Sequence, residues 1–204
     1  MKHADEFQTL GDGIYYWSVY EPSVKCEIGC AAFRLAGGLV VIDPVPLVES
    51  AWKELFALAP LRAILLTNGN HVRAAAELRK QFPVPVVTAP DTRRDIAELT
   101  PDAYLFPNEL LYGIAAIPIP GATAGETAFF VPSGVMVIGD AVINTNLEVG
   151  LEFLPDKYCT DAEQNRASLR KLLDYDFHTL IFAHGAPVTN HAKEKLSALL
   201  NSKS

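Results

Sequence analysis

The sequence contains no uninterrupted apolar stretch of about 18 residues, the length that a membrane-spanning helix requires. Basic residues are scarce in any one place. The densest groups are Arg93–Arg94 and Lys193–Lys195, and the formal net charge is -7. Proteins that neutralise phosphates usually carry a basic stripe, so we expect neither nucleic acid nor an anionic membrane surface as a partner.

Cysteine is also rare, with three residues and therefore an odd number. Cys26 and Cys30 are separated by three residues, whereas a redox or zinc pair has two between them. Reduced thiols are therefore expected. The segment MKHADEFQTLGDG mixes charges and has no apolar core of signal-peptide length. These features together predict a cytoplasmic protein.

Apolar residues make up 50% of the 204 positions, which is enough for a sizeable core. No linker or low-complexity stretch divides the chain, so we expect one domain over residues 1–204. Apolar runs and turn signals predict strands at Gly13–Tyr20, Ile28–Leu35, Leu39–Asp43, Ala63–Leu66, Val84–Thr88, Tyr112–Ile119, Glu126–Val131, Val135–Ile138 and Thr179–Ala183. Helical spacing predicts helices at Leu47–Phe56, Val72–Lys80, Asp91–Leu99, Thr160–Leu173 and Ala192–Leu200.

The order of these elements is informative. Strand-rich and alternating segments each occur twice, which predicts an α/β (α+β) fold of two mixed β-sheets face to face with helices outside. The pair Gly37-Gly38 lies between two apolar runs and predicts a hairpin. Thr160 and Glu163 have the spacing of a capping box, which predicts the start of a helix.

Candidate functional residues gather in loops at the ends of predicted strands, where a rigid scaffold exposes chemistry. One loop reads TNGNHVRAAAEL and another PIPGATAGETAFF. The remaining two read VMVIGDAVI and LIFAHGAPV. In order, the four loops occupy Thr67–Leu78, Pro118–Phe130, Val135–Ile143 and Leu180–Val188.

Together these loops resemble the signature loops of the metallo-β-lactamase superfamily. There the first is usually THxHxDHxGG, the second PGHTxGS, the third a strand ending GD and the fourth a strand ending GHG before Pro. The segment LVVIDP resembles the family's strand that ends in Asp. The resemblance runs from about Gly11 to Leu200 and implies a four-layer αββα sandwich.

The resemblance also implies two metal ions held by five histidines and two aspartates, and here the chain departs from the family. Ala122 stands where the second loop has histidine, while Asp140 and His184 are retained. If VRAAAEL is laid over the family's VGGAAEL, His71 takes the place of the last histidine and Asn70 that of the preceding aspartate. If the loop is anchored on Thr67 instead, Asn68 and Asn70 replace the first two histidines and Arg73 the last. Both alignments remain open.

The departures remove the first metal site, since an amide oxygen is a weak neutral ligand and a methyl group is none. His71, Asp140 and His184 still form a two-histidine, one-carboxylate set, which suits one zinc, iron or manganese ion. Asn68, Asn70, Arg73 and Ala122 would line the cleft. With such an ion, water could attack an ester or thioester, and Asp140 or His184 would handle protons.

A cleft without metal is the alternative, with a structural role for each residue. His71 would bond to a neighbouring amide, Asp140 would cap a turn, and His184 would bond to Asp140. Arg73 would then pair with Asp140 and supply the positive charge of the missing ion. Two functions follow: a hydrolase with one metal ion or none, and a non-catalytic relative that binds a small molecule or a partner in the old cleft.

Overall fold

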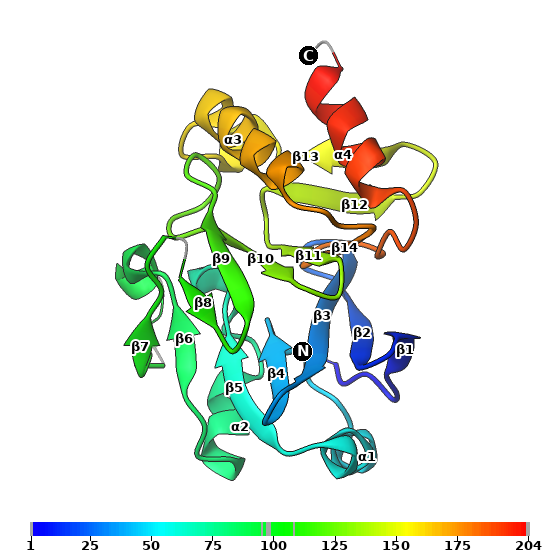
Figure 1. Ribbon diagram of the computed structural model, residues 1–204, viewed down its shortest axis with the longest axis vertical. Coiled ribbons are helices and arrows are strands. Elements are labelled where there is room, and N and C mark those ends of the chain that lie inside the picture. Colours follow the sequence, from blue (N-terminus) through cyan, green and yellow to red (C-terminus); the bar gives the residue numbers. More distant parts are fainter. Residues whose placement is uncertain (1, 95, 97–98, 108, 203–204) are drawn as a thin grey trace.

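The computed structural model describes residues 2–94, 96, 99–107 and 109–202, and its β-strands form two large mixed sheets and a separate two-stranded sheet (Figure 1). The larger sheet has seven strands and the second has five. In sheet order, the larger sheet contains β1 (Gln8–Gly11), β2 (Ile14–Glu21), β3 (Cys26–Leu35), β4 (Gly38–Ile42), β5 (Leu61–Leu65), β6 (Val86–Thr88) and β7 (Ala103–Tyr104).

The second sheet is built mainly from the second half of the chain. In sheet order it contains β14 (Thr179–Phe182), β11 (Val135–Ile138), β10 (Thr127–Val131), β9 (Ile114–Pro118) and β8 (Leu110–Leu111). The strands β12 (Val142–Asn146) and β13 (Gly150–Phe153) pair with each other. Strands β4 to β7 run parallel to one another, as do β11 and β14.

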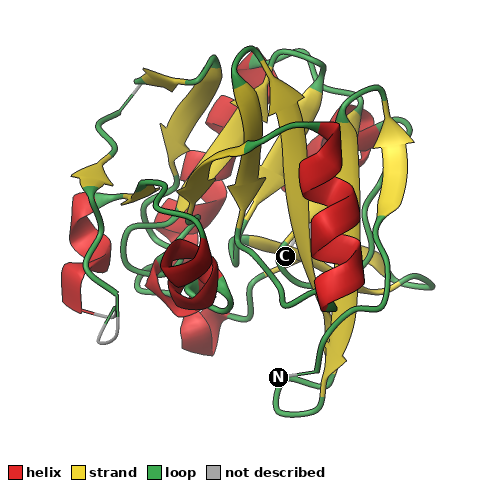
Figure 2. Cartoon of the chain, turned by 90° about the horizontal axis from the view of Figure 1, so that it is seen from below, coloured by secondary structure: helices red, strands yellow, loops and turns green. Residues whose placement is uncertain are grey.

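Helices cover the outer faces of both sheets, as predicted (Figure 2). Helices α1 (Glu49–Leu58) and α2 (Ala75–Gln81) lie beside β4, β5 and β6 in Figure 1. Helices α3 (Ala162–Leu169) and α4 (Ala192–Asn201) lie at the other end of the view. Short 3-10 helices span Gly69–His71, Pro90–Arg94, Asp156–Tyr158 and Arg170–Asp174.

The core is arranged in layers because side chains alternate between the two faces of each strand. In β4, Val40 and Ile42 point between the two sheets, whereas Val41 points toward α1. In β11, Val137 packs between the sheets and Met136 packs toward α3 and α4. Both central strands are therefore buried on two faces, which explains their nearly unbroken apolar sequences.

Several predicted boundaries differ from the structure. The capping box at Thr160 is wrong: Asp161 is the N-cap of α3, and its carboxylate accepts a hydrogen bond from the Gln164 N–H. The backbone N–H of Thr160 donates to the carbonyl of Ala122. The helix predicted from Val72 begins at Ala75, because Arg73 has a φ of 41°.

The helix predicted over Asp91–Leu99 is observed as the 3-10 helix Pro90–Arg94, and residues 95, 97 and 98 lie outside the described part of the chain. The hairpin predicted at Gly37-Gly38 is confirmed, since β3 and β4 pair in an antiparallel manner. The predicted arrangement of two mixed sheets with outer helices is also confirmed.

The two large sheets touch directly where β3 passes the end of β14. The Gly29 N–H donates to the carbonyl of Ala183 at 3.0 Å, and the Gly185 N–H donates to the carbonyl of Glu27 at 2.8 Å. A Cβ atom on Gly29 would lie 2.9 Å from the carbonyl oxygen of Phe182, so glycine permits this close approach. Within the described residues, no helix is long and apolar enough to cross a membrane.

Candidate functional site

A cluster of polar side chains lies where the strands of the two sheets end, near this contact. Asp43 follows β4 and Thr67 follows β5, while Asp140 follows β11 and His184 follows β14. Asp43, Thr67 and Asp140 are buried, and the His184 side chain is 18% exposed. The ends of these strands thus collect ionisable groups in a largely closed space.

His71 lies at the centre of this cluster, 2% exposed. Its Nδ1 atom is 3.0 Å from Oδ2 of Asp43 and 2.8 Å from Oγ1 of Thr67. Asp43 is itself held by the Thr67 backbone N–H and hydroxyl, at 2.8 and 2.6 Å. Nε2 of His71 lies 3.2 Å from Oδ1 of Asp140, yet among the described residues this buried atom has no hydrogen-bond partner.

Charge on His71 is controlled by its neighbours. Burial and the positive charge of Arg73 lower the pKa of His71, but the carboxylates of Asp140 and Asp43 raise it more, to about 9. Burial also opposes ionisation of Asp140, yet His71 and His184 outweigh it and hold the pKa of Asp140 well below its usual range. At neutral pH the centre is therefore an imidazolium between two carboxyl groups.

Asp140 joins the two histidines. Its Oδ1 atom lies 2.9 Å from Nε2 of His184, and its Oδ2 atom accepts a hydrogen bond of 2.9 Å from the amide Nδ2 of Asn68. Burial lowers the pKa of His184, although the hydrogen bond to Asp140 opposes this. The ligand atoms of His71, Asp140 and His184 all lie within 4.8 Å of one another.

Glu126 is a member of the cluster that the sequence did not indicate. Its Oε2 atom accepts hydrogen bonds from Asn68 Nδ2 at 2.7 Å and from the Thr123 hydroxyl at 3.1 Å, and its Oε1 atom accepts from the Ala141 N–H at 3.3 Å. Burial and the charge of Asp140 raise the pKa of Glu126 to about 8. In the sequence, Glu126 is a single carboxylate directly before the apolar run TAFFV.

Arg73 does not pair with Asp140, contrary to the metal-free alternative drawn from the sequence. Its guanidinium donates to the backbone carbonyls of Gly29 at 2.8 Å, Ala183 at 3.2 Å and Asp43 at 3.4 Å. Arg73 thus ties β3 to the ends of β4 and β14. Its positive charge acts on the cluster through space, where it lowers the pKa of His71.

The other residues predicted to line a cleft have different surroundings. Asn68 is fully buried and bridges the two carboxyl groups described above. Asn70 is exposed, and only its backbone N–H joins the loop, through a bond to Oδ1 of Asn68. Ala122 is fully buried in the hydrophobic layer beneath α3 and α4. Asn68 and Glu126 therefore contribute polar groups to the cluster, whereas Ala122 belongs to the hydrophobic layer.

The position of His71 favours one of the two alignments of the loop. His71 meets Asp140 and His184, as the last histidine of the family motif would, while the Arg73 side chain bonds to backbone carbonyls. This corresponds to the alignment of VRAAAEL with VGGAAEL. The shortened turn places the 3-10 helix Gly69–His71 between the strand and α2.

Cys26, at the start of β3, contacts the cluster from the outside. Its Sγ atom lies 3.6 Å from Nδ1 of His184, on the opposite side of the imidazole from Asp140. Burial raises the pKa of the Cys26 thiol, and the positive charge of Arg73 opposes this. Sequence reasoning left Cys26 as a free thiol, because its contact with His184 spans 158 residues.

The residues present fit one metal ion and not two. His71 offers a buried Nε2 that faces Asp140 at 3.2 Å, and Asp43 fixes its Nδ1, the arrangement that supports metal-ligating histidines. Ligand atoms about 2.1 Å from a shared ion lie roughly 3 to 3.5 Å apart, close to the 3.2 and 2.9 Å observed around Asp140. An ion would have to replace the proton that His71 carries.

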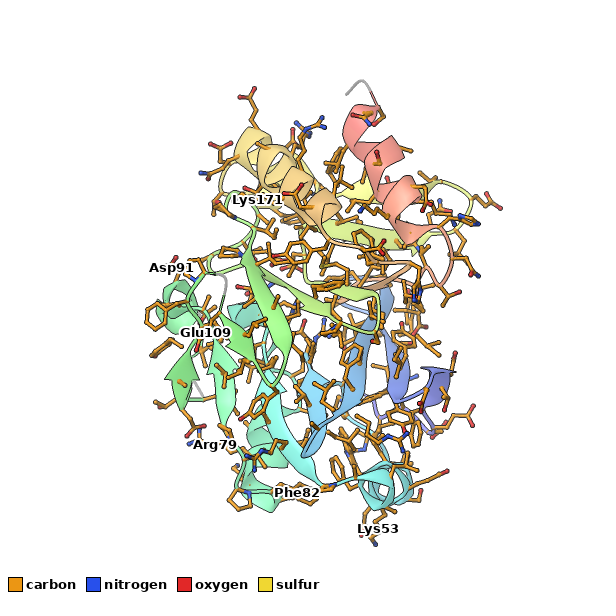
Figure 3. All side chains as sticks on the ribbon, in the orientation of Figure 1. Lys53, Arg79, Phe82, Asp91, Glu109 and Lys171 are labelled. Atoms are coloured by element: carbon orange, nitrogen blue, oxygen red, sulfur yellow. The ribbon has the colours of Figure 1, made fainter. Side chains whose placement is uncertain are left out.

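Among the residues that the structure describes, no second group of three such ligands lies together, and Asn68 offers only an amide and Ala122 a methyl group. A cavity of about 870 Å³ lies elsewhere, between α1 and α2, and its lining includes Lys53 and Phe82 (Figure 3). Its lining contains none of the residues of the polar cluster.

Comparison with known proteins extends over nearly the whole chain. The family model described as "Metallo-beta-lactamase superfamily" matches residues 9–203. No curated protein matches the sequence. Among solved structures, a metallo-beta-lactamase from Pontibacter korlensis is similar with a TM-score of 0.77 and 16% identity, over 97% of this chain and 99% of that one.

Two further solved structures show the same architecture. A metallo-beta-lactamase from Erythrobacter litoralis, with beta-mercaptoethanol in its active site, has a TM-score of 0.75 and 14% identity, over 95% of each chain. A metallo-beta-lactamase from Hirschia baltica has a TM-score of 0.72 and 15% identity, over 100% of each chain. These similarities establish the predicted αββα sandwich.

Proposed function

The chain belongs to the metallo-beta-lactamase superfamily, and from that membership we propose that it is a hydrolase with a single-metal site. His71, Asp140 and His184 would hold one Zn²⁺, Fe²⁺ or Mn²⁺ ion. When bound, such an ion supplies Lewis-acid polarisation of a carbonyl group. The proposed substrate is a small molecule with an ester or thioester bond. The observation that carries this proposal is the convergence of the ligand atoms of His71, Asp140 and His184, which all lie within 4.8 Å of one another.

The surrounding residues have positioning roles in this proposal. Asp43 and Thr67 orient the His71 ring so that Nε2 faces Asp140. Asn68 occupies Oδ2 of Asp140 and leaves Oδ1 toward the two histidines. His184 is the most exposed of the three ligands and would be the first to meet a substrate, which suits it to proton transfer.

Metal analysis tests the proposal directly. We expect about one equivalent of metal in protein purified without a chelating tag. The variants Asp140→Ala and His184→Ala should lose both the metal and any esterase activity. His178→Ala and His191→Ala are matched controls, because these histidines lie outside the cluster. Metal-free wild-type protein whose esterase activity survives both cluster substitutions would refute the proposal of a single-metal hydrolase.

Burial favours one alternative, a non-catalytic relative that binds a small molecule or a partner. His71 is 2% and Asp140 7% exposed, so the centre of the cluster is hardly accessible. In that case the wild type would contain no metal, and Asp140→Ala would only lower the thermal stability. Cobalt titration followed by absorption spectroscopy distinguishes the two functions, because it reports binding without requiring a substrate.

A further inference from the structure

Two partly exposed side chains, Cys26 and His184, form a second chemical arrangement at the edge of the polar cluster. The Cys26 and His184 side chains are both partly exposed, whereas His71 and Asp140 are buried behind them. A molecule that approaches the cluster therefore meets a thiol and an imidazole first. Neither the family match nor the proposed metal site assigns a role to this thiol.

The three side chains lie in a row. Sγ of Cys26 is 3.6 Å from Nδ1 of His184, and Nε2 of the same ring is 2.9 Å from Oδ1 of Asp140. When Nε2 carries its proton toward the carboxylate, Nδ1 is left with a lone pair directed at the thiol. A nucleophile, a base beside it and a third group that orients the base constitute the pattern of nucleophilic catalysis.

The backbone holds this row in place. Gly29 and Ala183 bond to each other across β3 and β14, and the ladder continues to Glu27 and Gly185. Arg73 donates to the carbonyls of Gly29 and Ala183, so its positive charge is fixed between the strand that carries Cys26 and the strand that leads to His184. Positive charge at this point favours a developing thiolate and opposes the burial that raises the pKa of the Cys26 thiol.

From this geometry we infer that Cys26 is a nucleophile for acyl groups, with His184 as its base and Asp140 as the positioning residue for His184. The inference applies to the chain without a cation, because Nε2 of His184 cannot bind an ion and carry a proton toward Asp140 at the same time. It names a reaction that the chain's own side chains can perform on an activated ester or thioester.

The chemistry balances as an ordinary acyl transfer. Sγ bonds to the carbonyl carbon while the thiol proton passes to Nδ1 of His184. The bond to the leaving oxygen or sulfur breaks, and the leaving group takes that proton. Water then attacks the S-acyl Cys26, again through His184, and releases the carboxylic acid with the thiol restored. The sum is ester or thioester plus water giving acid plus alcohol or thiol.

Cys159 serves as an internal control for the reactivity of Cys26. This thiol is also partly exposed, but it lies near the carbonyl of Leu154 and the amide of Asn165. Among the described residues, no histidine contacts it. Differences in reactivity between Cys26 and Cys159 therefore report on the neighbouring base and not on exposure alone.

The test uses the full chain after treatment with a chelator, so that its outcome is separate from that of the metal proposal. Iodoacetamide should alkylate Cys26 at least about tenfold faster than Cys159, as general-base assistance allows. With p-nitrophenyl acetate, peptide mass spectrometry should find an acetyl group on Cys26. The Cys159→Ser variant should behave as the wild type, whereas Cys26→Ser should not release the burst of nitrophenol.

Substitution of the base gives the sharper readout. His184→Asn should slow alkylation of Cys26 about tenfold and leave Cys159 unchanged. The ratio in the wild-type protein needs no variant, so the test survives a variant that fails to fold. Equal alkylation of the two cysteines, together with no acetyl group on Cys26, would overturn the inference.

Discussion

Replacement of Glu126 by glutamine should stabilise the protein at neutral pH, although it removes a side chain held by three hydrogen bonds. In the folded protein the pKa of Glu126 is raised from 4.5 to about 8 by burial and by Asp140. Because the pKa is raised on folding, the protonated Glu126 side chain contributes stability that is fully present below pH 4.5. This contribution is lost as the pH rises toward 8.

The size of the effect follows from the pKa shift. Each pH unit between the two pKa values lowers the unfolding free energy by about 1.4 kcal/mol. At pH 7 the wild-type protein has therefore lost about 3 kcal/mol of stability. Glutamine cannot ionise and avoids this loss. Its amide group cannot satisfy both the Asn68 amide and the Ala141 N–H, which costs about 1 kcal/mol. We therefore expect Glu126→Gln to be about 2 kcal/mol more stable at pH 7.

Urea denaturation of both proteins at a series of pH values from 4 to 8.5 measures this difference. Contributions from titrating groups far from Glu126 cancel when the two curves are subtracted. Below pH 4.5 the wild type should be the more stable protein, by about 1 kcal/mol. Glu163→Gln, at an exposed position in α3, is the surface control. A difference that stays constant over the series, or that increasingly favours the wild type, would refute the assignment of Glu126 as a neutral buried acid.

Substitutions of Asn68, Arg73 and Gly139 test the cluster by equilibrium or thermal unfolding. Asn68→Ala should cost about 3 kcal/mol because two buried carboxyl groups lose a donor, whereas Asn70→Ala, at an exposed side chain, should cost less than about 0.5 kcal/mol. Arg73→Met should cost about 3 kcal/mol, since three backbone carbonyls lose their donor, and lysine should restore only part because it lacks the guanidinium fork. Gly139→Ala should lower the melting temperature, since the added Cβ would lie 2.5 Å from Oγ1 of Thr67; an unchanged melting temperature would contradict this packing.

Much of the fold could be predicted because the signals are local. The unbroken apolar runs VVI and VMVI mark strands buried on two faces, and the Gly37-Gly38 pair marks a hairpin. Helix starts were less predictable where the backbone is held by distant groups. Thr160 resembles an N-cap in sequence, but its N–H is engaged by Ala122, so the helix begins after Asp161.

The candidate site was predicted in part. The loops indicated that His71, Asp140 and His184 would converge, and their ligand atoms do lie together. Glu126 and Cys26 could not be predicted as members, because their partners lie 58 and 158 residues away and no local pattern marks either contact. The expected pairing of Arg73 with Asp140 was wrong because three backbone carbonyls compete for the guanidinium.

The direct contact between the two sheets has a consequence for hydrogen exchange. The amide of Gly29 donates to Ala183, and that of Thr127 donates to Thr67, so each bond joins one sheet to the other. These amide protons can exchange with solvent only when the sheets part or the whole domain unfolds. Their exchange rates therefore measure the opening of the sandwich itself, residue by residue, in the unmodified protein.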